Sequence, residues 1–311
     1  MLSDHMKSWL GLPVQPLGFE ELKGTVPDLS RTICRLYIEW ESEGSFSELF
    51  ARFLQLPGVE RTPGIIIGSF HGDEPGADSH EPVELLVNAH ARLPALRGIF
   101  LGDIISEENE ISWINQCDVS PLFAAFPRLE HFAVRGSTGL VLGRLAHAQL
   151  KSLVIQCGGL PRSVLADVAQ SSLPGLEHLE LWLGTDNYGW DGTVADLRPL
   201  IDGTRFPALR TLGLKNSEIQ NDVAAAVAGA PIVARLTALD LSMGNMSDPG
   251  GEALLRHPEL KRLKTLDLHH HFLSEGMQAK VKAAFPQADL SEPQEADGEG
   301  DDEYRHIAVS E

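Results

Sequence analysis

One spacing of hydrophobic residues recurs along most of the chain: a leucine-like residue is followed by two others, three and five positions later. Seven such groups lie between residues 93 and 285. They are Leu96-Ile99-Leu101, Leu129-Phe132-Val134, Leu150-Leu153-Ile155, Leu176-Leu179-Leu181, Leu209-Leu212-Leu214, Leu236-Leu239-Leu241 and Leu263-Leu266-Leu268. Successive groups begin 33, 21, 26, 33, 27 and 27 residues apart. Recurrence at this interval is typical of a solenoid, in which neighbouring repeats complete one continuous core.

The pattern predicts a strand in each group, followed in several of the groups by a helix. The second and third apolar residues share one face of a strand, because side chains alternate along it. After the group that begins at Leu209, the residues Ile219, Val223 and Val227 continue at helical spacing. Such βα units stack their strands in parallel. The expected fold class is therefore an α/β solenoid, with a parallel sheet on the concave face and helices on the convex face.

The pattern weakens toward both ends of the chain. Ile33-Leu36-Ile38 repeats the spacing, and Ile65–Ile67 could form another strand. We therefore expect an N-terminal cap over 1–30, a solenoid over 31–290 that is clearest over 93–285, and an acidic tail over 291–311. Eight acidic residues against one arginine predict that this tail is disordered. Its last residues, YRHIAVSE, alternate apolar and polar positions, so docking by strand addition is the alternative.

Two segments carry a family resemblance. FPALRTLGLKNSEI and LTALDLSMGNMSDPGGEALL resemble leucine-rich repeats of the ribonuclease-inhibitor-like subclass. The whole chain, with its closing YRHIAVSE, is similar to an uncharacterised bacterial family of cytoplasmic leucine-rich repeat proteins. This resemblance implies a horseshoe and no established activity. One departure is that the ninth repeat position, often Asn, holds residues such as Ser217, Gly244 and His271. Backbone groups in the loops must then find other partners.

Composition narrows the partners and the compartment. A net charge of −19 argues against nucleic acid and anionic membranes, which attract clustered Lys and Arg. A basic protein partner remains compatible with it. Three scattered cysteines indicate reduced thiols, and no apolar stretch is long enough to span a bilayer. We therefore expect a cytoplasmic protein, whereas its oligomeric state cannot be predicted.

Residues between the buried strand positions should face the concave surface, where a partner would bind. These candidates are Arg35, Tyr37, His131, Arg135, His178, Glu180, Trp182, Lys215, Asp240, Asp267 and His269. At one strand position the last four groups read Glu180, Gly213, Asp240 and Asp267, which predicts an acidic stripe. We expect this stripe to receive a basic segment, with Trp182 as an apolar anchor and Lys215 offsetting the repulsion. A merely solvated acidic face is the alternative.

The favoured function is a non-catalytic adaptor or scaffold that binds a protein through the concave face. One alternative is an accessory subunit or inhibitor of an enzyme encoded nearby. Another is a metal- or thiol-dependent enzyme that uses Asp240, Asp267 and His269, or Cys157. The sequence lacks the common phosphate-loop, zinc-protease and serine-hydrolase motifs. No catalytic residue, metal or cofactor is therefore assigned.

Overall fold

The computed structural model describes residues 2–40, 42, 44–70, 76–298 and 304–311. In this part of the chain, twelve strands form one sheet, and their order in space is their order in sequence. The strands are β1 (Ser8–Trp9), β2 (Leu12–Leu17), β3 (Ile33–Leu36), β4 (Gly64–Ile67), β5 (Gly98–Leu101), β6 (His131–Arg135), β7 (Ser152–Gln156), β8 (His178–Gly184), β9 (Thr211–Ser217), β10 (Ala238–Asp240), β11 (Thr265–Asp267) and β12 (Ala288–Asp289). Only β1 and β2 pair antiparallel. The parallel remainder is a repeat array.

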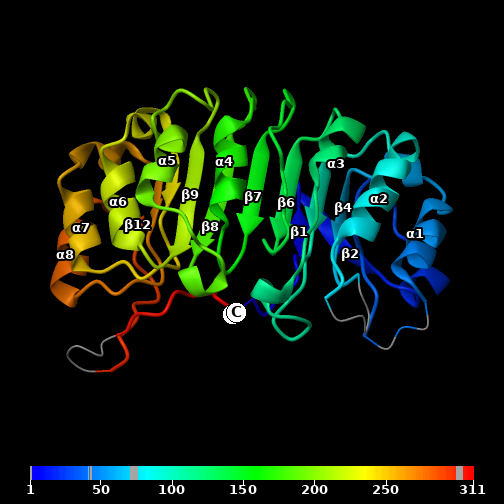
Figure 1. Cartoon of the computed structure of the whole chain (residues 1–311), viewed down its shortest axis with the longest axis horizontal. Helices are drawn as coiled ribbons and strands as arrows, with labels where there is room; N and C mark the ends of the chain where they lie inside the picture. Colours follow the sequence, from blue (N-terminus) through cyan, green and yellow to red (C-terminus); the bar gives the residue numbers. More distant parts are fainter. Residues whose placement is uncertain (1, 41, 43, 71–75, 299–303) are drawn as a thin grey trace.

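The α-helices cover one face of this sheet, as Figure 1 shows. They are α1 (Phe46–Leu54), α2 (His80–Asn88), α3 (Ser120–Ala125), α4 (Arg162–Gln170), α5 (Val194–Ile201), α6 (Gln220–Ala228), α7 (Asp248–Leu255) and α8 (Glu275–Ala284). Ser45 and Glu48 form a reciprocal capping box at the start of α1, which satisfies backbone N–H groups there. No helix in the described ranges has the length and apolarity that a bilayer crossing requires.

The recurring leucines form the core because the strands pair in register. Phe132, Leu153, Leu179, Leu212, Leu239 and Leu266 occupy one position on six successive strands. Each is at most 1% exposed. Most repeats thus bury their leucines between the sheet and a helix and against those of their neighbours. The repeat that begins at β6 has no helix over residues 136–149, and there Leu140, Leu142 and Leu145 complete the core instead. This confirms the α/β class and the repeat array predicted from the spacing.

Buried amides and an imidazole close the loops where the ninth-position Asn is missing. Gln116 Nε2 donates to the carbonyl of Arg135 at 2.7 Å, and Gln220 Nε2 donates to that of Leu214 at 2.9 Å. His271 Nδ1 accepts the N–H of Leu273 at 3.2 Å. Different side chains therefore satisfy these carbonyl and amide groups in different repeats.

An N-terminal hairpin folds back over the face that the helices leave free. It turns at Leu10 and Gly11, whose φ angles are 52° and 74°. The ring centroid of Trp9 lies 6.4 Å from that of Phe100 and 6.5 Å from that of His131. β1 pairs only with β2, but the hairpin lies over the sheet, so Figure 1 shows β1 beside β6. A second apolar cluster forms beneath it, made of Ile33, Ile66, Phe100 and Ala133 with Met6, Trp9, Leu10, Leu12, Val14 and Val154.

The predicted C-terminal tail packs on the fold over its last residues. Ile307 and Val309 are only 8% and 5% exposed, respectively. The backbone N–H of Ala308 donates to the carbonyl of Met243 at 2.8 Å. Disorder was expected over 291–311, but burial of two β-branched side chains holds 304–311 in place. The most acidic stretch, 299–303, lies outside the described residues.

Candidate functional site

Seven of the predicted residues gather on or directly after strands β8–β11, on the helix-free face. We call this set the open patch: His178, Glu180, Trp182, Lys215, Asp240, Asp267 and His269. The strand register pairs Glu180 with Gly213, Gly213 with Asp240, and Asp240 with Asp267. The acidic column predicted from sequence therefore exists. Its carboxylates are partly exposed, at 19%, 21% and 27%.

Lys215 is the internal counter-charge of the open patch. Its Nζ lies 2.7 Å from a carboxylate oxygen of Asp240 and 6.0 Å from the ring centroid of Trp182. Burial disfavours the ammonium form, but Asp240 and Glu180 outweigh it and raise the pKa of Lys215. The ammonium therefore stays charged and offsets the repulsion within the column. Three carboxylates against one ammonium leave the patch acidic.

The side chains around Lys215 are held by bonds within the patch. Trp182 is only 4% exposed, and its Nε1 donates to Glu180 at 2.8 Å. The tryptophan thus orients a carboxylate and presents little ring surface to a partner. His269 Nδ1 lies 2.8 Å from Asp267, and His178 Nε2 lies 3.8 Å from Glu180. Burial lowers the pKa of His178, which favours the neutral ring despite the neighbouring acids. The patch is pre-organised rather than loosely solvated.

Two predicted arginines lie instead in a buried ionic cluster beneath the N-terminal segment. Arg35 and Arg135 are each 4% exposed and flank Asp103, which is fully buried. Arg35 Nε donates to the Asp103 carboxylate at 2.9 Å, and a guanidinium nitrogen of Arg135 lies 3.7 Å from it. The backbone N–H of Met6 lies 3.3 Å from the same carboxylate. These arginines anchor the hairpin, so they are not available to a partner.

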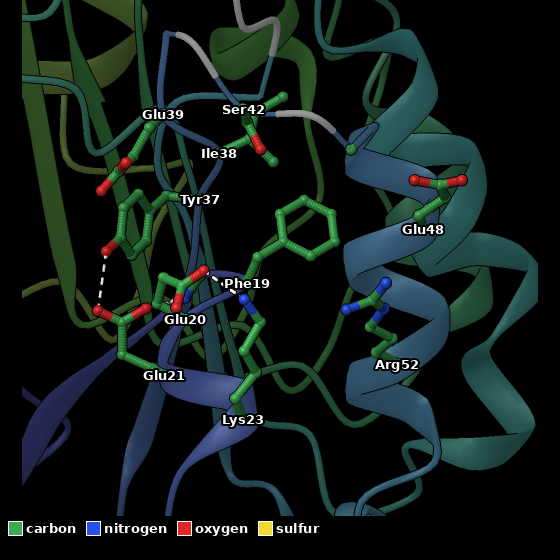
Figure 2. Close-up of a pocket in the computed structure, with 12 residues that line it drawn as sticks. Phe19, Glu20, Glu21, Lys23, Tyr37, Ile38, Glu39, Ser42, Glu48 and Arg52 are labelled. Carbon is green, nitrogen blue, oxygen red and sulfur yellow. Dashed lines mark hydrogen bonds and ion pairs between the residues drawn. The ribbon is translucent and has the colours of Figure 1, made fainter.

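Tyr37 lines a separate cavity of about 440 Å³ at the N-terminal end of the array (Figure 2). Its hydroxyl donates to Glu21 at 3.1 Å. Burial and the adjacent Glu21 raise the pKa of Tyr37 to about 12. The remaining lining is mostly charged and mixes both signs, with Glu20, Glu39, Glu48, Lys23 and Arg52 around Phe19. This cavity is distinct from the open patch. His131, the last predicted residue, touches Trp9 of the hairpin.

The thiol and metal alternatives can be judged from the same geometry. Cys157 is fully buried, and its Sγ lies 3.2 Å from the carbonyl of Trp182. Burial raises the pKa of this thiol to about 12, which disfavours the nucleophilic thiolate. Asp240, proposed as a metal ligand, points to Lys215. Among the described residues, no three His, Cys, Asp or Glu side chains are grouped to hold a metal ion.

The chain is similar to a known structure over most of its length. No protein-family model and no curated protein sequence matches it. A crystal structure of a Bacteroides fragilis protein superimposes with a TM-score of 0.78 at 33% sequence identity. The match covers 88% of this chain and 76% of that one. The chain belongs to the same family as this Bacteroides fragilis protein.

The two proteins therefore share one fold over most of their lengths, and this shared part includes the repeat array. Within this fold, sequence reasoning missed two features of the helix-free face. The hairpin was expected only as a cap, and Asp103 was not considered. The sequence did contain an indication that a segment covers this face, because the large apolar residues Ile66 and Phe100 occupy strand positions that should face solvent. Both side chains are fully buried. Large apolar residues at outward positions therefore indicate a covering segment.

Proposed function

We propose that the chain is a leucine-rich repeat horseshoe that binds a protein partner, without catalysis, through the open patch on its concave face. The observation that carries this proposal is the register-aligned acidic column of Glu180, Asp240 and Asp267. Its carboxylates are fixed by bonds to Trp182, Lys215 and His269. Fixed charges lose little side-chain entropy on binding, so a pre-organised acidic column suits the recognition of a basic segment.

The covered half of the same face restricts where a partner can sit. The hairpin occupies the surface over β3–β6, whereas β8–β11 carry the partly exposed polar side chains. We therefore propose binding over about four strands rather than along the whole concave face. The charge of −19 and the lack of basic clusters favour a basic protein over nucleic acid. A cytoplasmic adaptor or scaffold is the role we propose.

Charge reversal tests this proposal directly. The double variant Asp240→Lys and Asp267→Lys is compared with wild type in affinity capture from a native lysate, followed by quantitative mass spectrometry. The control reverses Asp222 and Glu252, which are exposed on α6 and α7, so that the net charge changes equally. We expect a stoichiometric partner on wild type and control that is lost from the patch variant. Equal capture by all three folded proteins would refute the proposal.

A further inference from the structure

Residues 304–311 run across the ends of several strands as an extended segment. Ala308 donates its N–H to Met243, which follows β10. Val309 meets Asn216, near the end of β9, and Ser310 passes Gly158, which follows β7. Figure 1 shows this red segment crossing from the β12 side of the array toward β8. One short segment therefore contacts three or more repeats at the strand-to-helix edge.

Asn216 is the polar centre of this contact. Its side chain is fully buried, and its φ of 54° is in the left-handed region, which Asn tolerates. Its Oδ1 accepts the N–H of Val309 at 3.0 Å, and its Nδ2 donates to the carbonyl of Val309 at 2.5 Å. The carboxamide thus pairs with both the N–H and the C=O of one residue, Val309, as a neighbouring strand would. Both hydrogen bonds are made to the backbone, so they do not depend on which side chain the bound residue carries.

Two other features fit the surface to a thin, extended chain. Ile307 and Val309 are both buried, and the polar or small residues beside them are more exposed. A methyl group at Gly158 would collide with the carbonyl oxygen of Ser310. Tyr188 donates its hydroxyl to the carboxylate of Glu311 beyond that point. We call the surface around Gly158, Asn216 and Met243 that this segment covers the groove. It admits only backbone at Gly158 and takes aliphatic side chains at alternate positions.

The segment is attached to the fold by a short acidic connection. Asp297 and Tyr304 exchange backbone hydrogen bonds of 2.9 and 2.8 Å. A tethered segment of this kind has an effective concentration on the order of 1 mM. It therefore fills the groove in the isolated chain, yet a competing segment of sufficient affinity can replace it.

We propose that this groove is a receptor for an extended segment of a partner protein in which two aliphatic residues are separated by one residue. Residues 304–311 are its intramolecular occupant, which the partner's segment displaces. The groove lies at the strand-to-helix edge, so this site is separate from the open patch and does not depend on the function proposed for it.

Binding of a synthetic peptide in trans tests the proposal on full-length protein. The labelled probe is Tyr-Arg-His-Ile-Ala-Val-Ser-Glu, the sequence of residues 304–311, and its binding is followed by fluorescence anisotropy. Val309→Ser in the full chain weakens the internal segment and leaves the groove intact. If the peptide binds with a dissociation constant near 100 μM, an internal competitor at about 1 mM weakens it about tenfold. We therefore expect the V309S protein to bind the probe about tenfold more tightly than wild type.

Two controls make the outcome specific. The double variant Val309→Ser with Gly158→Ala should not bind the probe, because the added methyl group blocks its path. A probe with Asp in place of the valine should bind none of the proteins. No binding to folded V309S protein, or equal binding to wild type and V309S, would overturn the proposal.

Hydrogen exchange on wild type answers the question even if V309S does not fold. We expect the amides of Ala308 and Val309 to exchange at least tenfold faster than that of Leu212, because the segment opens locally. Exchange of all three at one rate would show that the segment opens only with the whole fold, which also overturns the proposal.

Discussion

Asp103→Asn should destabilise the protein more than most single substitutions. Asp103 is fully buried, and its carboxylate contacts the guanidinium groups of Arg35 and Arg135 and the N–H of Met6. Asparagine has nearly the same shape but carries no charge. Two buried guanidinium groups would then face a neutral amide whose NH₂ group cannot accept their hydrogen bonds.

The expected size of the effect follows from burial. Removing one partner of a buried ion pair costs about 3–5 kcal/mol. Glu108 lies 3.5 Å from a guanidinium nitrogen of Arg35 and compensates part of the charge that remains, so we expect a loss of about 3 kcal/mol, at the low end of this range. Burial already lowers the pKa of Arg135, while Asp103 opposes this shift, so the carboxylate directly stabilises the charged guanidinium. A weaker bond to Met6 also loosens the segment that precedes the hairpin, while β2 stays paired with β3. We therefore expect both a lower free energy of unfolding and faster proteolysis within residues 2–12.

Urea denaturation followed by circular dichroism measures the loss. Glu130→Gln is the matched control, since Glu130 pairs with Lys151 at 2.5 Å but on the surface, where that lysine side chain is 47% exposed. Surface pairs contribute about 0–1 kcal/mol, so the control should change little. If Asp103→Asn lost no more than the control, the ionic cluster would not anchor the hairpin and our reasoning would be refuted.

Three further predictions concern the core, the pH dependence and the thiols. Leu212→Asp places a carboxylate in the central core and should remove most circular dichroism at 222 nm; an unchanged spectrum would contradict the array. Burial lowers the pKa of His271 below its ordinary 6.5, so the unfolded chain binds the proton first as the pH falls below about 6.5. Stability should therefore decline from about pH 7 to pH 5, and His271→Asn should reduce this slope by up to about 1.4 kcal/mol per pH unit in urea titrations. Burial also raises the thiol pKa of Cys34 and Cys157 to about 12, so iodoacetamide at about pH 8 should label both only after unfolding; fast labelling of either one in native protein, distinguished by mass spectrometry from the partly exposed Cys117, would contradict their burial.

The array could be predicted because one periodic signal determines it. Buried leucines at fixed spacing give the strands, and equal spacing in each repeat gives their register. The column from Glu180 to Asp267 follows from that register alone. Such features depend only on neighbouring repeats, which the sequence presents in order.

The covered half of the helix-free face, where the hairpin lies over β3–β6, could not be predicted in the same way. Met6 and Asp103 are 97 residues apart and belong to no common period. Arg35 and Arg135 occupy outward strand positions, where arginine normally meets solvent. They are buried here because they pair with the carboxylate of Asp103 and because the hairpin lies above them. The docking of Val309 on Asn216 is likewise a contact across 93 residues. The alternating pattern in YRHIAVSE suggested docking but not its location.

The central claim is that a partner protein sits on the open patch, and site-specific photo-cross-linking tests it most directly. A photoreactive amino acid replaces Thr211 on β9, which pairs with His178 of the open patch, or Ala225 on α6, on the helix-covered side. Both proteins are irradiated in the native lysate, and adducts are identified by mass spectrometry. We predict a discrete protein adduct from position 211 and none of the same mass from position 225. The same adduct from both positions, or an adduct from position 225 alone, would contradict the account.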